Sequence, residues 1–251
     1  MNNILIIGDS CTDVFIYGIC NRLNPEAPVP IMYETYRTQN PGMAGNVHQN
    51  LLHLGLEADF MTQKEEIIKT RFVEEKSNYI LLRFDKDTKI TSKNDVRSIP
   101  FESYDMVIVS DYNKGFLSEE DIRHILKRSK TSFVDTKKPI DEWVRNASFI
   151  KINEEEFGSI KNNKAFMLDE LAKKVIITLG DQGAAYYGDY FRPPKEVVTR
   201  DVVGAGDTFL AALAGHYLLN RDIETAINFA NLCAGQVVGK RGVAYPDEKL
   251  A

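Results

Sequence analysis

Short runs of β-branched and aromatic residues alternate along this chain with longer stretches that carry helical periodicity. This alternation is typical of an α/β fold with a largely parallel central sheet flanked by helices, because a crossover between parallel strands usually contains a helix. We predict strands at residues 4–7, 58–61, 106–109, 132–134, 149–152 and 175–178. We predict helices at residues 45–54, 118–130, 208–219 and 223–239, the third of them nearly buried.

A different pattern occupies residues 29–36, 70–74 and 79–84, where alternate residues suit strands with one wet face. We expect these segments to form a small β-sheet lid, within about residues 12–36 and 70–85. Such a lid leaves an apolar face uncovered, so a homodimer through the lid strands is a further expectation. No linker divides the chain, and residues 1–251 are expected to form a single domain.

Composition narrows the range of partners. With 31 Lys plus Arg against 36 Asp plus Glu, the net charge of -5 gives no general attraction to nucleic acid or to an anionic membrane. No stretch approaches the ~20 apolar residues that span a bilayer. The N-terminus lacks the basic leader of a signal peptide, and the three cysteines lack the spacing of a zinc site or a disulfide framework. We therefore expect a cytoplasmic protein with no nucleic-acid or membrane partner.

Polar residues directly follow most of the predicted strands. In an open parallel sheet, ligands bind beyond the carboxyl ends of the strands, so these are the positions where a site is expected. The residues at these positions are Gly8, Asp9, Ser110, Asp111, Asp135, Asn153 and Gly180. Each alone is more often a helix cap or a turn residue, but together they favour a binding crevice.

The sharpest local signal is the run Asp-Val-Val-Gly-Ala-Gly-Asp-Thr at residues 201–208, a glycine-rich turn that leads directly into a predicted helix. Bare amides at a helix N-terminus form a cradle for a phosphate or an oxyanion. Asp207 stands at its rim, where we expect the helix dipole and free amides to keep the carboxylate ionised and able to accept a proton. The plainer alternative is that Asp207 or Thr208 only caps the helix. The turn is neither a Walker A loop nor a dinucleotide fingerprint.

Residues 40–46, Asn-Pro-Gly-Met-Ala-Gly-Asn, are interpreted as a second glycine-bearing turn that opens a helix. Asn46 is then available to hydrogen-bond a sugar hydroxyl. Viewed alone, this segment is equally well an ordinary loop and cap.

Taken together, these motifs resemble those of the PfkB (ribokinase-like) carbohydrate kinases, whose Asp-x-x-Gly-Ala-Gly-Asp signature stands at residues 201–207. The resemblance covers nearly the whole chain in order, and is closer still to the D-glycero-β-D-manno-heptose-7-phosphate kinase domain of ADP-heptose synthesis. The run Asn-Pro-Glu-Ala-Pro-Val-Pro at residues 24–30 and Asp-Tyr-x-Lys-Gly at residues 111–115 point to that branch. Similar stretches occur at residues 8–13, 41–46, 135–137, 153–156 and 237–240.

The resemblance implies a ribokinase-like fold and ATP-dependent phosphorylation of a sugar hydroxyl, the anomeric hydroxyl of a heptose 7-phosphate in the closest branch. It implies that Asp207 is the catalytic base and that the amides of Gly204, Ala205 and Gly206 stabilise charge on the transferred group. ATP and Mg²⁺ are the implied cofactors, and the residues implied to hold them are Asn153, Glu156, Thr178, Gly180 and Gly183, with Glu156 at the metal. The residues expected to grip the sugar phosphate are Asp13, Gly42 and Asn46, with Lys114 and Lys137 as our own candidates for its phosphate.

The chain departs from the family pattern in three places. Val203 replaces the usual Thr, Met43 replaces one Gly of the usual Gly-Gly pair, and residues 61–70 lack the customary Gly-x-Asp-x-x-Gly segment and the helix after it. These changes trim the acceptor half and motivate alternatives: a catalytically silent nucleotide- or sugar-binding regulatory homologue, or a kinase for another sugar phosphate or a nucleoside. No His-x-Gly-His motif is present, so we do not expect the nucleotidyltransferase domain of bifunctional family members.

Overall fold

A computed structural model describes residues 3–91, 95–160, 169–194, 199–240 and 242–250. Within these residues, eight strands form the large sheet, in the spatial order β12, β11, β10, β9, β8, β7, β1 and β4. Their bounds are β1 Ile4–Gly8, β4 Asp59–Met61, β7 Met106–Asp111, β8 Ser132–Thr136, β9 Phe149–Asn153, β10 Val175–Thr178, β11 Ala184–Tyr186 and β12 Asp189–Phe191. The pairs from β4 to β10 are parallel, and β11 and β12 add an antiparallel edge. The predicted mostly parallel sheet is confirmed.

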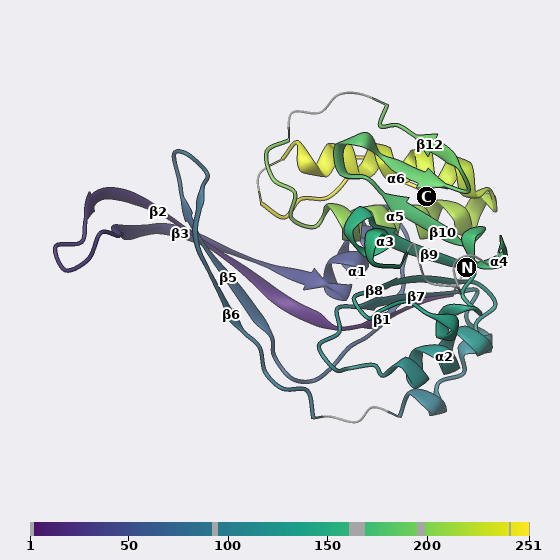
Figure 1. Ribbon diagram of the computed structural model, residues 1–251. Coiled ribbons are helices and arrows are strands. Elements are labelled where there is room, and N and C mark those ends of the chain that lie inside the picture. The colour runs from purple at the N-terminus through teal and green to yellow at the C-terminus, as the bar shows by residue number, and fades with distance from the viewer. Residues whose placement is uncertain (1–2, 92–94, 161–168, 195–198, 241, 251) are drawn as a thin grey trace.

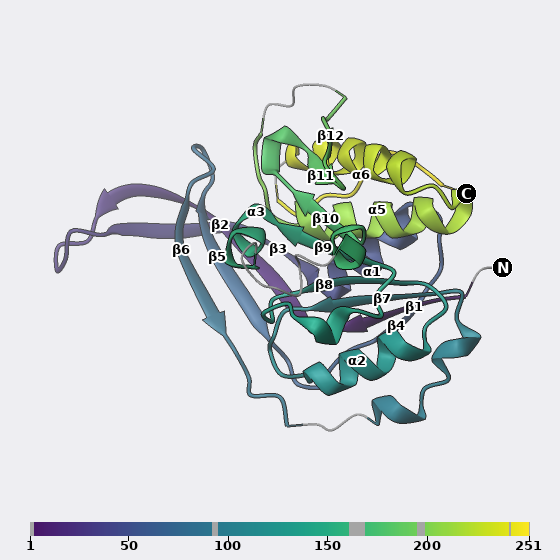
Figure 2. The same cartoon turned by 45° about the vertical axis from the view of Figure 1, so that its right-hand side comes forward.

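Helices cover both faces of this sheet (Figures 1 and 2). On one face lie α1 Ala44–His53, α5 Ala205–Asn220 and α6 Ile223–Val238. On the other face lie α2 Glu119–Arg128, α3 Glu154–Ile160 and α4 Asp169–Ala172. Short 3-10 helices occur at Val96–Ser98, Phe101–Ser103, Glu142–Val144 and Gly180–Gln182. Because both faces are covered, central strands such as β1 are buried along their whole length.

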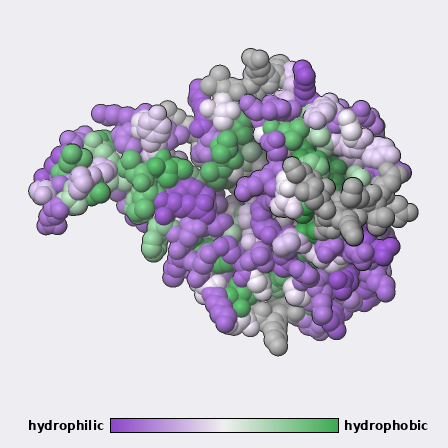
Figure 3. All heavy atoms as spheres, in the orientation of Figure 1, coloured by the Kyte–Doolittle hydropathy of each residue, from purple (hydrophilic) through white to green (hydrophobic). Residues whose placement is uncertain are grey.

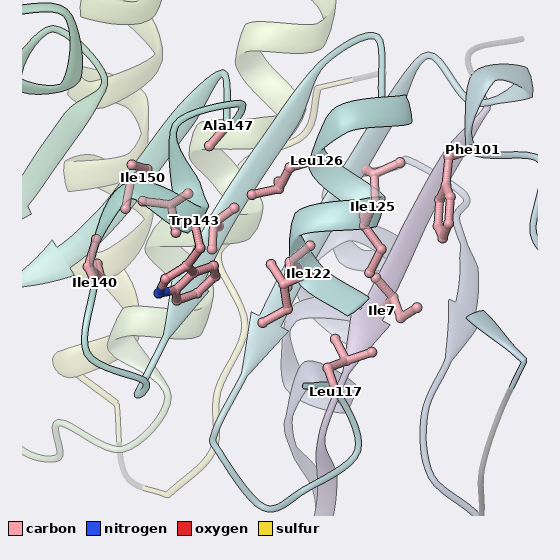
Figure 4. Packing of buried hydrophobic residues seen from close by; sticks show 14 of the residues in the cluster. Ile7, Phe101, Leu117, Ile122, Ile125, Leu126, Ile140, Trp143, Ala147 and Ile150 are labelled. Carbon is pink, nitrogen blue, oxygen red and sulfur yellow. The ribbon is translucent and has the colours of Figure 1, made fainter. Parts of the chain in front are cut away.

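The two helical layers pack by different means. α2 is amphipathic and begins with a capping box between Ser118 and Asp121. It places Ile122 and Ile125 against the sheet beside Ile7, as Figure 4 shows. Burial of each such side chain contributes roughly 1.5–3 kcal/mol. α5 is apolar on nearly every side and lies between α1 and α6, which confirms the predicted buried helix.

A second sheet forms the expected lid, and its strand order is β3, β2, β5 and β6. The bounds are β2 Ser10–Leu23, β3 Pro30–Met43, β5 Ile68–Glu74 and β6 Ile80–Lys86. The hairpin of β2 and β3 extends beyond the body of the molecule as an arm (Figure 1). β5 alternates between half-buried and buried residues, so Lys69, Arg71 and Val73 share its inner face.

The interpretation of residues 40–46 as a turn is wrong in its first half. Asn40, Pro41 and Gly42 continue β3, and α1 begins at Ala44 without an intervening loop. Pro41 is tolerated because β3 is an edge strand, where the missing N–H leaves no ladder bond unmade on the open side.

Across the described ranges, every helix is too short or too polar to cross a bilayer.

Candidate active site

The glycine-rich turn lies at the start of α5. Gly204 has a φ of 80°, a left-handed conformation that favours glycine, and it occupies the N-cap position. The N–H of Thr208 donates to the Gly204 carbonyl at 2.9 Å and closes the first turn. No side chain caps the helix, so the alternative in which Asp207 or Thr208 serves only as a cap is wrong. Asp207 instead lies inside the first turn, near the positive end of the helix dipole.

The carboxylate of Asp207 is held from two sides. The Tyr112 hydroxyl donates to Oδ1 at 2.7 Å, and Nδ2 of Asn46 donates to Oδ2 at 2.9 Å. Asn46 is itself fixed, because Asn50 donates to its Oδ1 at 3.2 Å and Thr208 donates to Asn50 at 2.9 Å. The structure therefore uses the amide of Asn46, expected to face a sugar, to orient Asp207.

Burial controls the charge of Asp207. The residue is 6% exposed, and desolvation raises the pKa of its carboxyl to about 6 despite the lowering effects of Tyr112, Asn46 and Lys151. The loss of solvent outweighs the groups that favour the charged form, yet a carboxyl with a pKa of about 6 is still mainly ionised at neutral pH and can accept a proton, as expected. Burial likewise raises the pKa of the Tyr112 hydroxyl well above 10, so it remains a hydrogen-bond donor. A carboxyl that titrates near neutrality suits a general base.

Asp9 organises the loop that carries Tyr112. Its carboxylate accepts hydrogen bonds from the backbone N–H groups of Tyr112 at 2.8 Å, Lys114 at 3.1 Å and Phe116 at 3.2 Å. Asp9 is fully buried, and desolvation is the main cause of its raised pKa. The polar residue after the first strand thus acts as an internal scaffold for the Asp207 partner, an arrangement that carboxylates commonly form with successive backbone amides.

Lys151 lies beneath the glycine-rich turn, and the sequence reading missed it. It is buried in β9, and its Nζ is 2.5 Å from Oδ2 of buried Asp135. A Cβ added at Gly206 would lie 3.2 Å from this Nζ, so the ammonium and the turn are in contact. The sequence signal that could have revealed it is a lysine between the apolar residues of β9, because a lysine that is buried needs a partner of opposite charge.

A cavity of about 940 Å³ opens on the other side of the turn. Four of the residues expected to hold the nucleotide line it, together with the predicted cradle and α6. The lining includes Asn153, Thr178, Gly180, Gly183, Ala205, Gly206, Phe209, Asn231, Ala234, Gly235 and Val238. The size falls in the range of small-molecule sites, and its position beyond the carboxyl ends of β9 and β10 is the one expected for an open parallel sheet.

Glu156 and Asn153 bind each other at the start of α3. The Glu156 N–H donates to Oδ1 of Asn153 at 2.7 Å, and the Asn153 N–H donates to Oε2 of Glu156 at 2.8 Å. The other carboxylate oxygen of Glu156 contacts Lys137, which also lies 3.8 Å from Asp135. Within the described residues, no group of three or more His, Cys, Asp or Glu side chains is arranged to hold a metal ion. This donor set fits a Mg²⁺ that keeps its waters and binds through phosphates, rather than one enclosed by protein ligands.

On the lid side, Asp13 and Gly42 lie together. A Cβ at Gly42 would collide with Oδ2 of Asp13, so only a glycine fits there. Asp13 is buried and forms an ion pair with buried Arg71 of β5. The Cys11 thiol lies 3.8 Å from the same carboxylate, and burial raises the pKa of that thiol to about 12. The residue expected to grip the sugar is thus already neutralised by a partner that the sequence did not suggest.

The two lysines chosen for the acceptor phosphate both have carboxylate partners. Lys114 pairs with Asp87 at 2.6 Å, and Lys137 pairs with Glu156. Each ammonium would have to exchange a partly exposed ion pair, which contributes little stability, in order to bind a phosphate.

Met43 occupies the position where the family pattern has glycine. Its φ is 58° and its ψ is -132°, a conformation that side-chain-bearing residues rarely adopt. The side chain is buried against Cys11 and Ile67, with Tyr112 beside them. The thioether therefore fills space beside Tyr112, the residue that donates to Asp207.

Comparison with known proteins places this geometry in a family. The family model described as pfkB family carbohydrate kinase matches residues 46–250. The chain belongs to this family. The matched region includes the α5 turn, the nucleotide-side cavity and the Asn46 contact, so the assignment rests on the segment that carries the site.

One curated relative is the bifunctional protein HldE of a Nitratiruptor species, which is 32% identical over 290 residues. That match covers 96% of this chain and 62% of the relative, so the chain spans less than two thirds of its length. Among solved structures, ribokinase from Thermotoga maritima has a TM-score of 0.73 at 18% identity, covering 97% of this chain and 95% of that one. Arabidopsis thaliana ribokinase, complexed with ribose and ATP, has a TM-score of 0.67 at 15% identity, with 97% and 95% covered. These likenesses confirm the predicted ribokinase-like fold.

Proposed function

We propose that this carbohydrate kinase transfers the γ-phosphoryl group of ATP to the anomeric hydroxyl of a heptose 7-phosphate. The observation that carries the proposal is the Asp207 carboxylate, oriented by Tyr112 and Asn46 and adjacent in the chain to Gly206, which lines a cavity of a size suited to a nucleotide. The HldE relative and the heptose-branch motifs at residues 24–30 and 111–115 support the choice of acceptor.

In this mechanism, the acceptor hydroxyl gives its proton to Asp207 as its oxygen bonds to the γ-phosphorus. The bond from that phosphorus to the bridging oxygen breaks and leaves ADP, so the product is a 1,7-bisphosphate. The N–H groups of Gly204, Ala205 and Gly206 stabilise charge on the phosphoryl oxygens, and Lys151, paired with Asp135 beneath them, supports the turn in this position. Phosphoryl transfer needs mainly alignment and charge neutralisation, and these groups supply both.

The nucleotide belongs in the cavity between the α5 turn and α6, against Thr178, Gly180 and Gly183. Mg²⁺, when bound, neutralises the phosphates and aligns them for transfer. Asn153 and Glu156 would hold it through its waters, since their direct bonds are to each other and to Lys137.

A homodimer through the lid is part of the proposal. Alternate residues of edge strand β6 are exposed and apolar: Ile80 51%, Leu82 57% and Phe84 59%. Apolar surface also gathers on the projecting arm and where it meets the body, as Figure 3 shows. A second copy of the chain would cover this face and the open strand edges. Within the described residues the three cysteines are free thiols, which fits our proposal of a cytoplasmic location.

Two observations favour a second candidate, a catalytically silent nucleotide- or sugar-binding regulatory homologue. Arg71 forms an ion pair with Asp13, and Met43 fills space beside Tyr112. The same two observations fit a third hypothesis, in which the protein keeps the kinase chemistry and the acceptor is another sugar phosphate or a nucleoside.

An acceptor panel separates these functions. We would measure ADP release by the intact chain with Mg-ATP and a heptose 7-phosphate, hexose phosphates, the corresponding free sugars and nucleosides. The proposal predicts the highest kcat/KM with the heptose 7-phosphate and a 1,7-bisphosphate product identified by phosphorus NMR. Nucleotide binding with no turnover on any acceptor would instead favour the silent homologue.

A further inference from the structure

Lys69 differs from the other buried basic residues in the described part of the chain. The other two are Arg71 and Lys151. Arg71 pairs with Asp13 and Lys151 pairs with Asp135, whereas the Lys69 ammonium has neither an ion pair nor a hydrogen bond among the described residues. The Nζ of Lys69 lies over the Tyr112 ring, and Asp13 and Asp85 are opposite Lys69 on the two neighbouring strands. A ligand that brings an anionic oxygen would give this ammonium a charge-assisted hydrogen bond.

The position of Lys69 connects it to the proposed base. Its side chain is 8% exposed on the inner face of β5, and its Nζ lies 5.3 Å from the centre of the Tyr112 ring. The hydroxyl of the same ring donates to Asp207. One aromatic ring and one hydrogen bond thus separate the ammonium from the carboxylate that would accept the proton.

The carboxylates near Lys69 are committed to other partners. Asp13 pairs with Arg71, and Asp85 is held by two hydrogen bonds from Arg83 at 2.8 Å and 2.7 Å. Asp87, just after β6, pairs with Lys114 at 2.6 Å.

The ammonium of Lys69 also remains reachable. Among the described side chains, the sealed polar atoms without a partner are Ser110 Oγ and His124 Nε2, and Lys69 Nζ is not one of them. The Nζ of Lys69 therefore keeps a small contact with solvent, which is the side from which a ligand would reach it.

We propose that Lys69 is the residue that recognises a phosphate monoester already carried by the acceptor. The inference rests on the proposed kinase function and assigns its acceptor-phosphate subsite to the lid, in place of Lys114 and Lys137. The acceptor then spans the Tyr112 ring, with its hydroxyl at Asp207 and its phosphate at Lys69. The charge-assisted bond forms on binding and does not change during transfer, so it contributes to KM rather than to kcat.

The kinetic test compares Lys69→Met with the matched control Lys86→Met, which removes an exposed lysine from the lid strand β6. For the phosphorylated acceptor, we expect Lys69→Met to raise KM by about 10- to 100-fold with a much smaller change in kcat. The control should leave KM unchanged, and Lys69→Arg should recover part of the affinity. Equal KM values for Lys69→Met and the wild type, or the same loss on an unphosphorylated sugar, overturn the assignment.

Two further measurements keep the inference testable if no acceptor is turned over. Calorimetric titration with the sugar-phosphate panel and with inorganic phosphate, at saturating ADP, should show weaker binding to Lys69→Met than to the wild type by about tenfold or more. The Tm of the ligand-free variant, compared with that of the wild type, checks that Lys69→Met folds normally. Equal binding by the two proteins, or absence of phosphate binding by the wild type, contradicts the inference. If the wild type turns over no acceptor but binds sugar phosphate more tightly than Lys69→Met does, the proposed kinase function is overturned and the phosphate site at Lys69 stands.

Discussion

At the scale of single residues, Asp207 draws its properties from contacts that are remote in the sequence. Tyr112 and Asn46 fix the direction of its carboxylate, and Asp9 fixes Tyr112 through the backbone of the following loop. Burial then raises the pKa of Asp207 to about 6. The carboxylate is thus held in place and its pKa is raised before any substrate binds, as the proposed role of a base requires.

The raised pKa of Asp207 predicts the pH dependence of the reaction. Only the ionised carboxylate accepts a proton, so kcat/KM should rise with pH through about 6 and reach a plateau above it. The measurement is kcat/KM from about pH 4.5 to about pH 8.5 at saturating Mg-ATP. A plateau that extends down to the acid end of this range would show that burial does not raise this pKa.

Sequence reasoning singled out the residue at the centre of the proposed site and missed the charged residues around it. The Gly-Ala-Gly-Asp run identified Asp207, because phosphate cradles need adjacent glycines at a helix start. Lys151 and Arg71 gave no such local signal, since their partners Asp135 and Asp13 lie on other strands. The upward shift of the Asp207 pKa to about 6 also gave no local signal, because depth of burial is a property of the folded chain.

At the scale of elements, long apolar segments were predicted well, and strands with mixed composition were not. The strand at residues 4–7 and the buried helix α5 are confirmed, because nearly all of their residues contact the core. β3 extends through Pro41 and Gly42. These residue types predict a turn, but they are tolerated here because β3 is an edge strand. The antiparallel strands β11 and β12 also escaped prediction, because three-residue strands carry little periodicity.

The first turn of α5 can be tested by Gly206→Ala. Alanine favours a helix by about 1 kcal/mol over glycine, so the free energy of unfolding should be kept or raised. The new Cβ would lie 3.2 Å from Nζ of Lys151, which must shift, so kcat should fall by at least about tenfold. Urea denaturation and steady-state kinetics measure the two effects.

Gly158→Ala is the matched control, since a Cβ at that position of α3 meets nothing within 4 Å. It should gain stability without a change in kcat. Wild-type kcat in Gly206→Ala would mean that the contact between the turn and Lys151 does not matter for catalysis.

At the scale of the whole molecule, the proposed site lies where the two sheets meet. The large sheet and α5 supply the cavity side, with Asp207 at the boundary. The lid supplies Asp13, Arg71 and Lys69, of which the first two form an ion pair. The sequence pattern predicted an α/β protein with a lid, and the ion pairs within the lid and within the large sheet became visible only in three dimensions.

The lid also makes a prediction about assembly. Leu82→Glu places a charge in the exposed apolar row of β6, so it should convert a dimer to a monomer in sedimentation velocity experiments. Lys76→Glu, in the exposed segment between β5 and β6, is the control and should remain dimeric. A monomeric wild type at micromolar concentrations would contradict the proposed homodimer.

The most direct test of the account is Asp207→Asn, compared with Asp222→Asn, which should preserve the exposed cap of α6. Because the folded pKa of Asp207 lies above the unfolded value, its contribution to stability is lost as pH rises through about 6, and Asp207→Asn should fold at least as stably as the wild type at about pH 8. The account predicts that this variant binds ADP normally and loses at least ~100-fold in kcat, while Asp222→Asn remains fully active. Turnover by Asp207→Asn within a few-fold of the wild type would contradict the assignment of the base.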